Sequence, residues 1–372
     1  MPKRVVHQLV HTLSYGDAIS TEVLALQRCF RKLGFVSEIY AINVHPRLKG
    51  QATLMSELRL DEPVEILLHY SLGSPLNEIY RSASHCLRGI VYHNLTPSSW
   101  FEGVNPRIVR DIQQGEHELP QLLELSDRII ADSQFNASEL EKLGFKAQVL
   151  ELAVDPDRWE EAANPGVSAL VRNDPGIHIL HVGRLAPNKC IEDLIRAFYF
   201  LHHFIDRASH LWLVGIDIDT ELYSFSLRHL VHELDLIDAV QFVGCMADSE
   251  VRALYENCSL YACMSEHEGF CLPVLEAMHF GLPVVSCDAT ALADTVGTGG
   301  ILVHEKRYPE LAELFAEVAQ NKALRDHLIQ LGHQRVKELS FERFEERASQ
   351  LFSANSFSTT SVRRVSQESR EC

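Results

Sequence analysis

Two glutamates, Glu268 and Glu276, are separated by seven residues in the stretch SEHEGFCLPVLEAMHFGLPVV. A glycine-containing loop lies between them, and Pro273 is well placed to open a helix. The backbone amides of such a helix start, around Cys271 to Val274, form a site for an anion. Carboxylates repel phosphate, so the glutamates are better suited to accept hydrogen bonds from sugar or ribose hydroxyls. The stretch therefore favours a ligand that carries both phosphate and sugar.

A second loop offers two cations. The run HILHVGRL (178–185) is typical of a strand, and a helical pattern begins near Ile191, so Arg184 and Lys189 lie on the loop between them. A guanidinium and an ammonium at the carboxyl end of a strand suit a diphosphate. Solvated loop cations are the competing interpretation. For Glu276 the competing interpretation is compensation of a helix dipole in a first turn, and for Glu268 it is loop solvation.

The elements that must position these residues follow a strand and helix alternation that occurs twice. This pattern predicts an α/β protein with two doubly wound parallel sheets in tandem. Ligands of such sheets bind outside the carboxyl ends of the strands, and two facing domains would form a cleft. The strand candidates are 4–10, 37–42, 64–70, 89–95, 128–133 and 148–154 in the first half, and 178–185, 210–216, 240–245, 259–265 and 283–289 in the second.

The chain is long enough for two domains. We expect a first, acceptor-side domain over 1–160, a linker rich in Asn, Pro and Gly over 161–176, and a nucleotide-sugar domain over 177–338. An amphipathic helix over 339–352 could pack on either domain, with packing back on the first as the expected arrangement. The Ser/Thr/Arg-rich tail over 353–372 is expected to be disordered.

Composition narrows the class of protein. No run approaches the roughly 18 apolar residues of a membrane span, and the first residues show no signal-peptide pattern. Nine cysteines without a CxxC pair indicate reduced thiols and a cytoplasmic protein. Residues 1–150 carry 15 basic and 17 acidic side chains, and the remainder carries 19 and 34. This balance argues against nucleic-acid binding. The near-neutral first half is the half better suited to peripheral contact with an anionic membrane surface, although solubility alone also explains the asymmetry.

The motifs GRLAPNK and SEHEGFCLPVLEAMHFGLPVV closely resemble those of the retaining glycosyltransferases of family 4. The two glutamates around GF-x-L-P, followed by E-A-M-x-x-G-x-P-V-V, are specific in that full form. SYGDAIS (14–20), YHNLTP (92–97) and DSQFNASEL (132–140) resemble the acceptor-side half of the family. The resemblance covers 4–352 and implies the GT-B fold, with two Rossmann-like domains facing an inter-domain cleft. One departure is Cys271, where glycine is more usual.

The resemblance implies a role for each matching residue. Arg184 and Lys189 would hold the donor diphosphate and stabilise the leaving nucleoside diphosphate. Glu268 would contact hydroxyls of the donor sugar near the reacting carbon, Glu276 would bind the ribose hydroxyls, and His93 would approach the donor sugar. A strand-end histidine satisfied by backbone groups is the competing interpretation of His93. The remaining implied donor contacts are Gly16 and Asp17 after the first strand, Gly244 and Cys245 beside the nucleobase, and the loop residues Gly269, Phe270, Cys271 and Leu272.

The function implied is transfer of a hexose, with mannose from GDP-mannose favoured over a UDP-hexose, to a hydroxyl of a glycan or lipid-linked acceptor. Nothing supplies the carboxylate pair of a retaining hydrolase, so the resemblance implies front-face attack with retention. No cofactor and no essential metal are expected, because capping or solvation better explains the D-x-D of Asp217 and Asp219. Two alternatives stay open: a nucleotide-sugar epimerase of the same fold, and a non-catalytic nucleotide-sugar-binding module.

Overall fold

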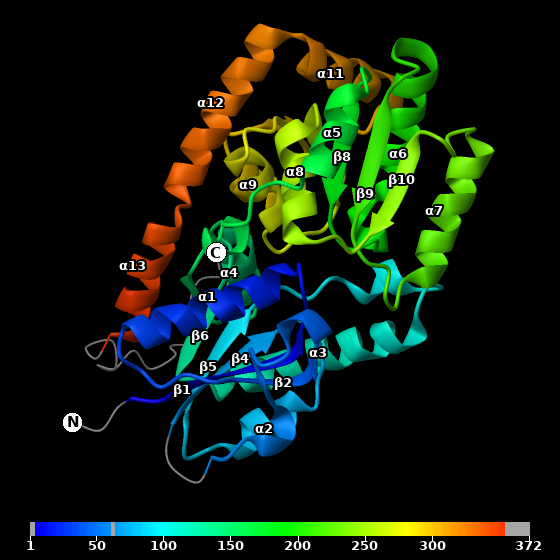
Figure 1. The fold of residues 1–372 in the computed structure, drawn as a ribbon. Coiled ribbons are helices and arrows are strands. Elements are labelled where there is room, and N and C mark those ends of the chain that lie inside the picture. Colours follow the sequence, from blue (N-terminus) through cyan, green and yellow to red (C-terminus); the bar gives the residue numbers. More distant parts are fainter. Residues whose placement is uncertain (1–3, 61–63, 354–372) are drawn as a thin grey trace, which may run out of the picture. The chain divides into compact units, whose positions relative to one another are not determined.

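The computed structural model describes residues 4–60 and 64–353 and divides into two compact units (Figure 1). The first unit is formed by the described residues of 1–98, 109–152 and 342–372, and the second by 99–108 and 153–341. Each unit is built on one parallel sheet with helices, which is the α/β arrangement that the alternating pattern predicts.

The first unit has a seven-stranded sheet in the order β3-β2-β1-β4-β5-β6-β7, with every neighbouring pair parallel. Its central strands are almost fully buried, as expected for a sheet covered on both faces. The strands are β1 (Val6–Leu13), β2 (Ile39–Val44), β3 (Thr53–Leu54), β4 (Glu65–Tyr70), β5 (Leu87–Tyr92), β6 (Arg128–Ala131) and β7 (Gln148–Val149).

Helix α1 (Ala18–Lys32) shows how local sequence sets an element of this unit. The side chain of Asp17 accepts from the amide of Ser20 at 3.0 Å and caps the helix. Gly34, with φ of +83°, follows its end in the left-handed backbone that glycine tolerates. The other helices are α2 (Leu76–Ser82), α3 (Pro106–Glu124), α4 (Gln134–Lys142) and α13 (Phe341–Phe352), with 3₁₀ turns η1 (Pro46–Leu48) and η2 (Met55–Glu57). All but the first residue of the turn η3 (Ser98–Phe101) and the first residues of α3 fall in segment 99–108 of the second unit.

Helix α13, the last described helix, belongs to the first unit and lies beside α1 (Figure 1). The ring of Phe352 packs edge-on against Phe30 at 4.7 Å, and the guanidinium of Arg128 lies 4.4 Å from the Phe352 ring centre. Arg4 donates from Nη1 to the carbonyl of Phe352 at 2.5 Å. The apolar face of this helix therefore closes the core of the first unit.

The second unit has a six-stranded parallel sheet in the order β10-β9-β8-β11-β12-β13. Its strands are β8 (His178–Val182), β9 (His210–Val214), β10 (Val240–Gly244), β11 (Leu260–Cys263), β12 (Val284–Cys287) and β13 (Ile301–Val303). Its helices are α5 (Pro165–Asn173), α6 (Ile191–Phe200), α7 (Glu221–Glu233), α8 (Asp248–Asn257), α9 (Leu272–His279), α10 (Leu292–Val296), α11 (Tyr308–Gln320) and α12 (Lys322–Glu338), with the short turns η4 (Asp157–Trp159), η5 (Pro187–Lys189) and η6 (Leu201–Ile205).

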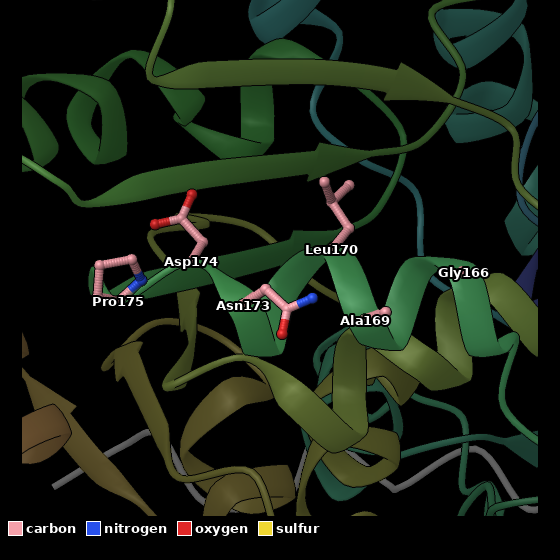
Figure 2. A pocket seen from close by; sticks show the side chains of 6 residues that line it. All are labelled: Gly166, Ala169, Leu170, Asn173, Asp174 and Pro175. Atoms are coloured by element: carbon pink, nitrogen blue, oxygen red, sulfur yellow. The ribbon is translucent and has the colours of Figure 1, made fainter.

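Segment 161–176, expected to be the linker between the domains, lies within the second unit and contains helix α5. The side chain of Asn164 accepts from the amides of Gly166 and Val167, and Pro165 opens the helix. Asn-Pro is therefore a helix start here and not a break. A shallow, open depression lies on this helix, as Figure 2 shows, and contains no residue of the predicted donor site. It is lined by Gly166, Ala169, Leu170, Asn173, Asp174 and Pro175.

The sequence pattern did not predict the strands β3 and β13, because each has only two or three residues. Of the tail predicted over 353–372, only Ser353 lies within the described residues. Among residues 4–60 and 64–353, no helix combines the length and apolar character of a membrane span.

Candidate functional site

Three glycines stand at the carboxyl ends of the adjacent strands β8, β9 and β10. The amide of Gly183 donates to the carbonyl of Val214, and the amide of Gly215 donates to Gly244, each at 2.9 Å. A Cβ on Gly215 would lie 1.9 Å from the Gly183 oxygen, and Gly215 has φ of +152°. Only glycine fits that position, so the strand ends approach one another closely at the edge where a ligand of this fold class binds.

Lys189, in the turn η5, reaches the glutamate loop that follows β11. Its Nζ lies 2.6 Å from Oε2 of Glu268, so the structure brings together these two predicted site residues from separate loops. Arg184 points to the loop after β9 and donates to the carbonyl of Ile218 at 2.6 Å. Arg184 and Lys189 thus lie on the same loop, but their side chains contact different segments.

Asn188 joins the two loops and was not singled out in the sequence. Its carbonyl accepts from the amide of Glu266 at 3.0 Å, and its Nδ2 donates to the carbonyl of His267 at 2.9 Å. The side chain is buried, so these bonds are shielded from water. Asn188 precedes Lys189 in the chain and bonds the two residues before Glu268. It therefore fixes the position of Lys189 relative to Glu268.

The charge state of Lys189 follows from its surroundings. Burial lowers the pKa of Lys189, but the carboxylate of Glu268 outweighs burial and the net pKa is raised, so the ammonium keeps its charge. His181, on β8, is also buried, and its Nδ1 lies 3.0 Å from the carbonyl of Ala262. Burial lowers the pKa of His181 to about 4, so it is neutral at pH 7. Of these two buried side chains, Lys189 is thus the one that presents a positive charge to Glu268.

The glutamate loop is anchored by threonines of the following segment. The hydroxyl of Thr290 accepts from the amide of Glu268 at 2.8 Å and donates to its carbonyl at 3.0 Å. Thr295 donates its hydroxyl to the carbonyl of Phe270. These bonds hold the backbone of residues 268–270 and preorganise the loop.

Cys271 occupies the N-cap of α9 with φ of +73°, the left-handed conformation that glycine prefers. This left-handed backbone explains why glycine is more usual at the position. Helix α9 begins at Leu272 with Pro273 in its first turn, as predicted. The amide of Val274 donates to the carbonyl of Cys271 at 3.1 Å, so this amide is used within the turn and not by an anion.

Glu276 lies in the second turn of α9 and is buried, so its expected place in the first turn, where it would compensate the helix dipole, is wrong. Arg158 donates from Nη1 to Oε1 at 2.6 Å, and the hydroxyl of Tyr255 donates to Oε2 at 3.0 Å. Arg158 also pairs with Asp248 at 3.0 Å. Burial raises the pKa of Glu276, and Arg158 opposes that shift. The carboxylate is therefore held inside the second unit by partners from two other elements.

The predicted nucleobase contacts, Gly244 and Cys245, lie at the carboxyl end of β10, the edge strand beside β9. Gly244 ends β10 with φ of +68°, and Cys245 follows it as an exposed residue.

The second aspartate of the D-x-D after β9 contacts other residues of the second unit. Asp219 pairs with Arg107 at 2.6 Å, and its carbonyl accepts from Asn105 at 2.9 Å. This aspartate thus anchors segment 99–108 to the second unit.

In the first unit, Gly16 and Asp17 form the turn between β1 and α1. Gly16 has φ of +78°, which explains the need for glycine. Oδ2 of Asp17 accepts from both the amide and the hydroxyl of Ser20. Asp17 therefore acts as a helix cap in this structure, and its neighbouring backbone forms the helix start that the sequence predicts.

His93 follows β5 and is buried in a chain of polar side chains. Its Nδ1 lies 3.2 Å from Oδ2 of Asp132, and its Nε2 lies 2.9 Å from Nδ1 of His69. Nε2 of His69 in turn meets Oε1 of Gln8 at 2.9 Å, while the amide nitrogen of Gln8 donates to the carbonyl of Val23. Every bond is satisfied when His69 is neutral and donates to Gln8, and His93 is protonated and donates to His69 and Asp132.

The pKa shifts agree with that assignment. Burial lowers the pKa of His69 well below its usual value. Burial also lowers the pKa of His93, but Glu22 and Asp132 reverse this and the net pKa is raised. Glu22, on α1, has a carboxylate oxygen 3.4 Å from Nδ1 of His93, and burial raises the pKa of Glu22 to about 8. Both ring nitrogens of His93 are thus bonded to side chains, and not to the backbone groups that the competing interpretation assumed.

Three groups of described residues bring potential metal ligands within 4.8 Å of one another. The first group comes from three separate elements and the third from two, whereas Cys263, Glu268 and Cys271 lie within nine residues of one another in the sequence. The expectation that no metal is essential remains a prediction. The groups are Glu22, His69 and His93; Cys263, Glu268 and Cys271; and Cys190, Asp193 and Glu266.

Residues 168–335 match the family described as glycosyl transferases group 1. The second unit is similar to that family. The O-antigen chain mannosyltransferase B of Escherichia coli is 25% identical over 170 residues, or 44% of this chain and 42% of the relative. The GDP-mannose:cellobiosyl-diphosphopolyprenol alpha-mannosyltransferase of Xanthomonas oryzae is 29% identical over 164 residues, or 43% and 40%. The chain thus spans about two fifths of the length of the curated relatives it matches.

Solved structures extend the likeness to both units. Sucrose-phosphate synthase from Thermosynechococcus elongatus superposes with a TM-score of 0.74 at 17% identity, covering 94% of this chain and 98% of that one. The Anabaena protein HepE, in complex with UDP and glucose, has a TM-score of 0.68 at 18% identity, covering 94% and 99%. At these identities the likeness concerns the fold. The GT-B fold predicted from the motifs, with two Rossmann-like units, is confirmed.

Sequence reasoning missed several residues that contact the predicted site residues. Asn188 stands inside the APNK motif, and its place between two cation-bearing loop residues was a usable signal. Arg158 and Tyr255 gave no signal, because both lie more than 15 residues from Glu276 and no motif connects them. Glu22 was hidden by its helical pattern, in which a carboxylate is expected on the solvent side.

Proposed function

We propose that this protein is a retaining glycosyltransferase that moves a hexose from a nucleotide-diphosphate sugar to a hydroxyl of a glycan or lipid-linked acceptor. The observation that carries the proposal is the Lys189–Glu268 pair, 2.6 Å apart at the carboxyl ends of β8 and β11. A buried ammonium suits the phosphates, and a carboxylate beside it suits the hydroxyls of the sugar attached to them. The similarity of residues 168–335 to group 1 glycosyl transferases supports it.

In this proposal the second unit holds the donor. Lys189 binds the diphosphate and Arg184 joins it, because two cations stabilise the negative charge that develops on the departing nucleoside diphosphate. Glu268 can accept from Lys189 and from a sugar hydroxyl at once, since a carboxylate offers about four acceptor positions. The backbone of residues 269–272 contacts sugar and phosphate, and Gly244 and Cys245 border the nucleobase.

Glu276 would bind ribose with a carboxylate that already accepts hydrogen bonds from protein side chains. Because Arg158 and Tyr255 already occupy its two oxygens, ribose hydroxyls would share a carboxylate that is held in place on both sides. Such a fixed acceptor loses little conformational freedom when a hydroxyl binds. We propose that Arg158 orients Glu276 for this contact.

The first unit contributes residues whose part rests on the family resemblance. The proposal includes Gly16 and Asp17, at the start of α1, as residues near the donor phosphates. It includes His93 as a residue near the donor sugar. Because Nε2 of His93 is bonded to His69, this role requires His93 to exchange that contact for the sugar.

The chemistry proposed is front-face substitution. The bond from the anomeric carbon to the phosphate oxygen breaks, the acceptor oxygen bonds to the same face of that carbon, and its proton passes to the departing phosphate. Lys189 and Arg184 stabilise the charge left on that phosphate, while Glu268 holds the sugar. No cofactor and no essential metal take part.

We propose mannose from GDP-mannose as the donor. The curated relatives named above include a mannosyltransferase of the O-antigen chain and one whose name specifies GDP-mannose and a diphosphopolyprenol acceptor. HepE was solved with UDP and glucose, so a UDP-hexose is the donor to test against it. A lipid-linked acceptor would place the protein at the cytoplasmic face of a membrane, with the first unit as the peripheral contact.

The experiment is incubation of the purified full chain with a panel of nucleotide sugars, with and without a polyprenol-linked glycan acceptor. We expect release of GDP from GDP-mannose, accelerated by acceptor, and a product with the donor's anomeric configuration by NMR. Inversion would exclude the front-face mechanism. An altered nucleotide sugar without acceptor would identify an epimerase, and binding without turnover would identify a non-catalytic module.

A further inference from the structure

Two thiols and a carboxylate converge in the loop after β11. Cys263 ends this strand, Cys271 precedes α9, and their sulfur atoms lie 4.0 Å apart. A carboxylate oxygen of Glu268 lies within 4.8 Å of both sulfurs. Cys263 is fully buried, whereas Cys271 is partly exposed and gives access from solvent.

The distance between the two sulfurs distinguishes two uses of a thiol pair. In a disulfide the sulfurs are about 2.05 Å apart, so this pair would have to close by about 2 Å. Two thiolates on one tetrahedral zinc ion, each about 2.3 Å from the metal, lie about 3.8 Å apart. The observed 4.0 Å therefore suits a shared cation with little movement.

The charges also balance. Two thiolates and one carboxylate carry three negative charges, and Lys189 with a divalent cation carries three positive ones. A buried group of charges is tolerated when it is paired in this way. In the group of Cys190, Asp193 and Glu266, Lys306 pairs with both carboxylates, at 2.8 Å and 2.7 Å, and only one thiol is present, whereas here Lys189 pairs with Oε2 of the single carboxylate and two thiols face each other.

We propose that Cys263, Cys271 and Glu268 form a site for a thiophilic divalent cation such as zinc, and that the cation inhibits use of the donor. On binding, both thiols release their protons to solvent and their sulfurs bond to the cation, with no oxidation. The cation fixes Cys271 and draws Glu268 away from the sugar. The site itself is independent of the proposed glycosyl transfer, whereas the inhibition rests on it.

The test titrates the reduced, metal-free full chain with Cd²⁺ and follows the sulfur-to-cadmium charge-transfer band in the ultraviolet, with Zn²⁺ as competitor. We expect saturation at one cation per chain. Cys263→Ala should abolish the band and weaken zinc binding by at least about tenfold, since even outer-shell changes cost that much. Cys258→Ala is the matched control, because it removes a buried thiol of the same unit outside the site.

Cys271→Gly is a second variant that keeps the test decisive, because glycine suits φ of +73° and the loop should fold. It should also lose the band. A wild-type protein without the band, or an unchanged band in Cys263→Ala, would overturn the proposal. Zinc should lower sugar transfer of the wild type more than that of Cys263→Ala. A band in a protein that transfers no sugar would leave the site standing and remove the proposed function.

Discussion

Arg158 donates from Nη1 to Oε1 of Glu276 at 2.6 Å and so joins the turn η4, near the start of the second unit, to helix α9. The carboxylate is 2% exposed and the guanidinium 14%, so the pair is shielded from water. A glutamate that the motif marks as a ligand contact is therefore also a structural member of its unit.

Replacement of Arg158 by Ala should destabilise the protein by about 3–5 kcal/mol, because it leaves the carboxylate of Glu276 buried without its partner. The measurement is chemical denaturation at pH 7. Glu276→Gln in the same background should recover part of the loss, since the buried charge is then gone. The control is Arg307→Ala, whose pair with Glu305 is exposed and should contribute less than about 1 kcal/mol. An equal, small effect of Arg158→Ala and Arg307→Ala would contradict the argument.

Replacement of Lys189 by Ala should lower kcat/KM for the nucleotide sugar by about 10²–10³, the cost of removing one preorganised group that stabilises developing charge. Glu268→Gln keeps the shape of the side chain and should lower the rate through weaker hydrogen bonds to the sugar. Initial rates of nucleotide release measure both variants. Arg307→Ala should keep the wild-type rate, and a similar loss in it would indicate a general defect.

Cys271→Gly should give a more stable protein than Cys271→Ala, by about 1–2 kcal/mol, because only the glycine variant relieves the left-handed backbone at φ of +73°. Both substitutions remove the same sulfur atom, so their difference isolates the backbone. Thermal unfolding of the two variants is the measurement. Equal stabilities would show that the backbone at this position is relaxed.

The pKa of Glu22 is raised by burial from 4.5 to about 8. Between these values the unfolded chain has ionised this carboxyl and the folded chain has not, so its contribution is present below pH 4.5 and is lost as pH rises to 8. The slope is up to about 1.4 kcal/mol per pH unit. Glu22→Gln removes the titration, so its stability relative to wild type should rise between pH 5 and 8. Denaturation of both proteins across that range checks the sign, and parallel curves would contradict it.

Much of the fold could be read from alternating apolar runs, because a parallel sheet buried on both faces leaves its strands almost without polar residues. Strands such as β4 and β8 lie where the pattern places them. The segment around Pro165 was misjudged, since Asn, Pro and Gly serve both helix starts and irregular chain. Contacts with α8, which no local pattern reports, stabilise the helix there.

The sequence by itself determined which residues have the chemistry for a sugar nucleotide, because Lys189, Glu268 and Glu276 stand in motifs whose spacing is local. Only the tertiary structure decided their partners. Glu268 meets Lys189, and Glu276 meets Arg158 and Tyr255. These contacts depend on the order of strands in the sheet and on burial. Burial removes a carboxylate from water, so the nearest charged group then has a large effect on its pKa. Spacing along the chain carries no information on either.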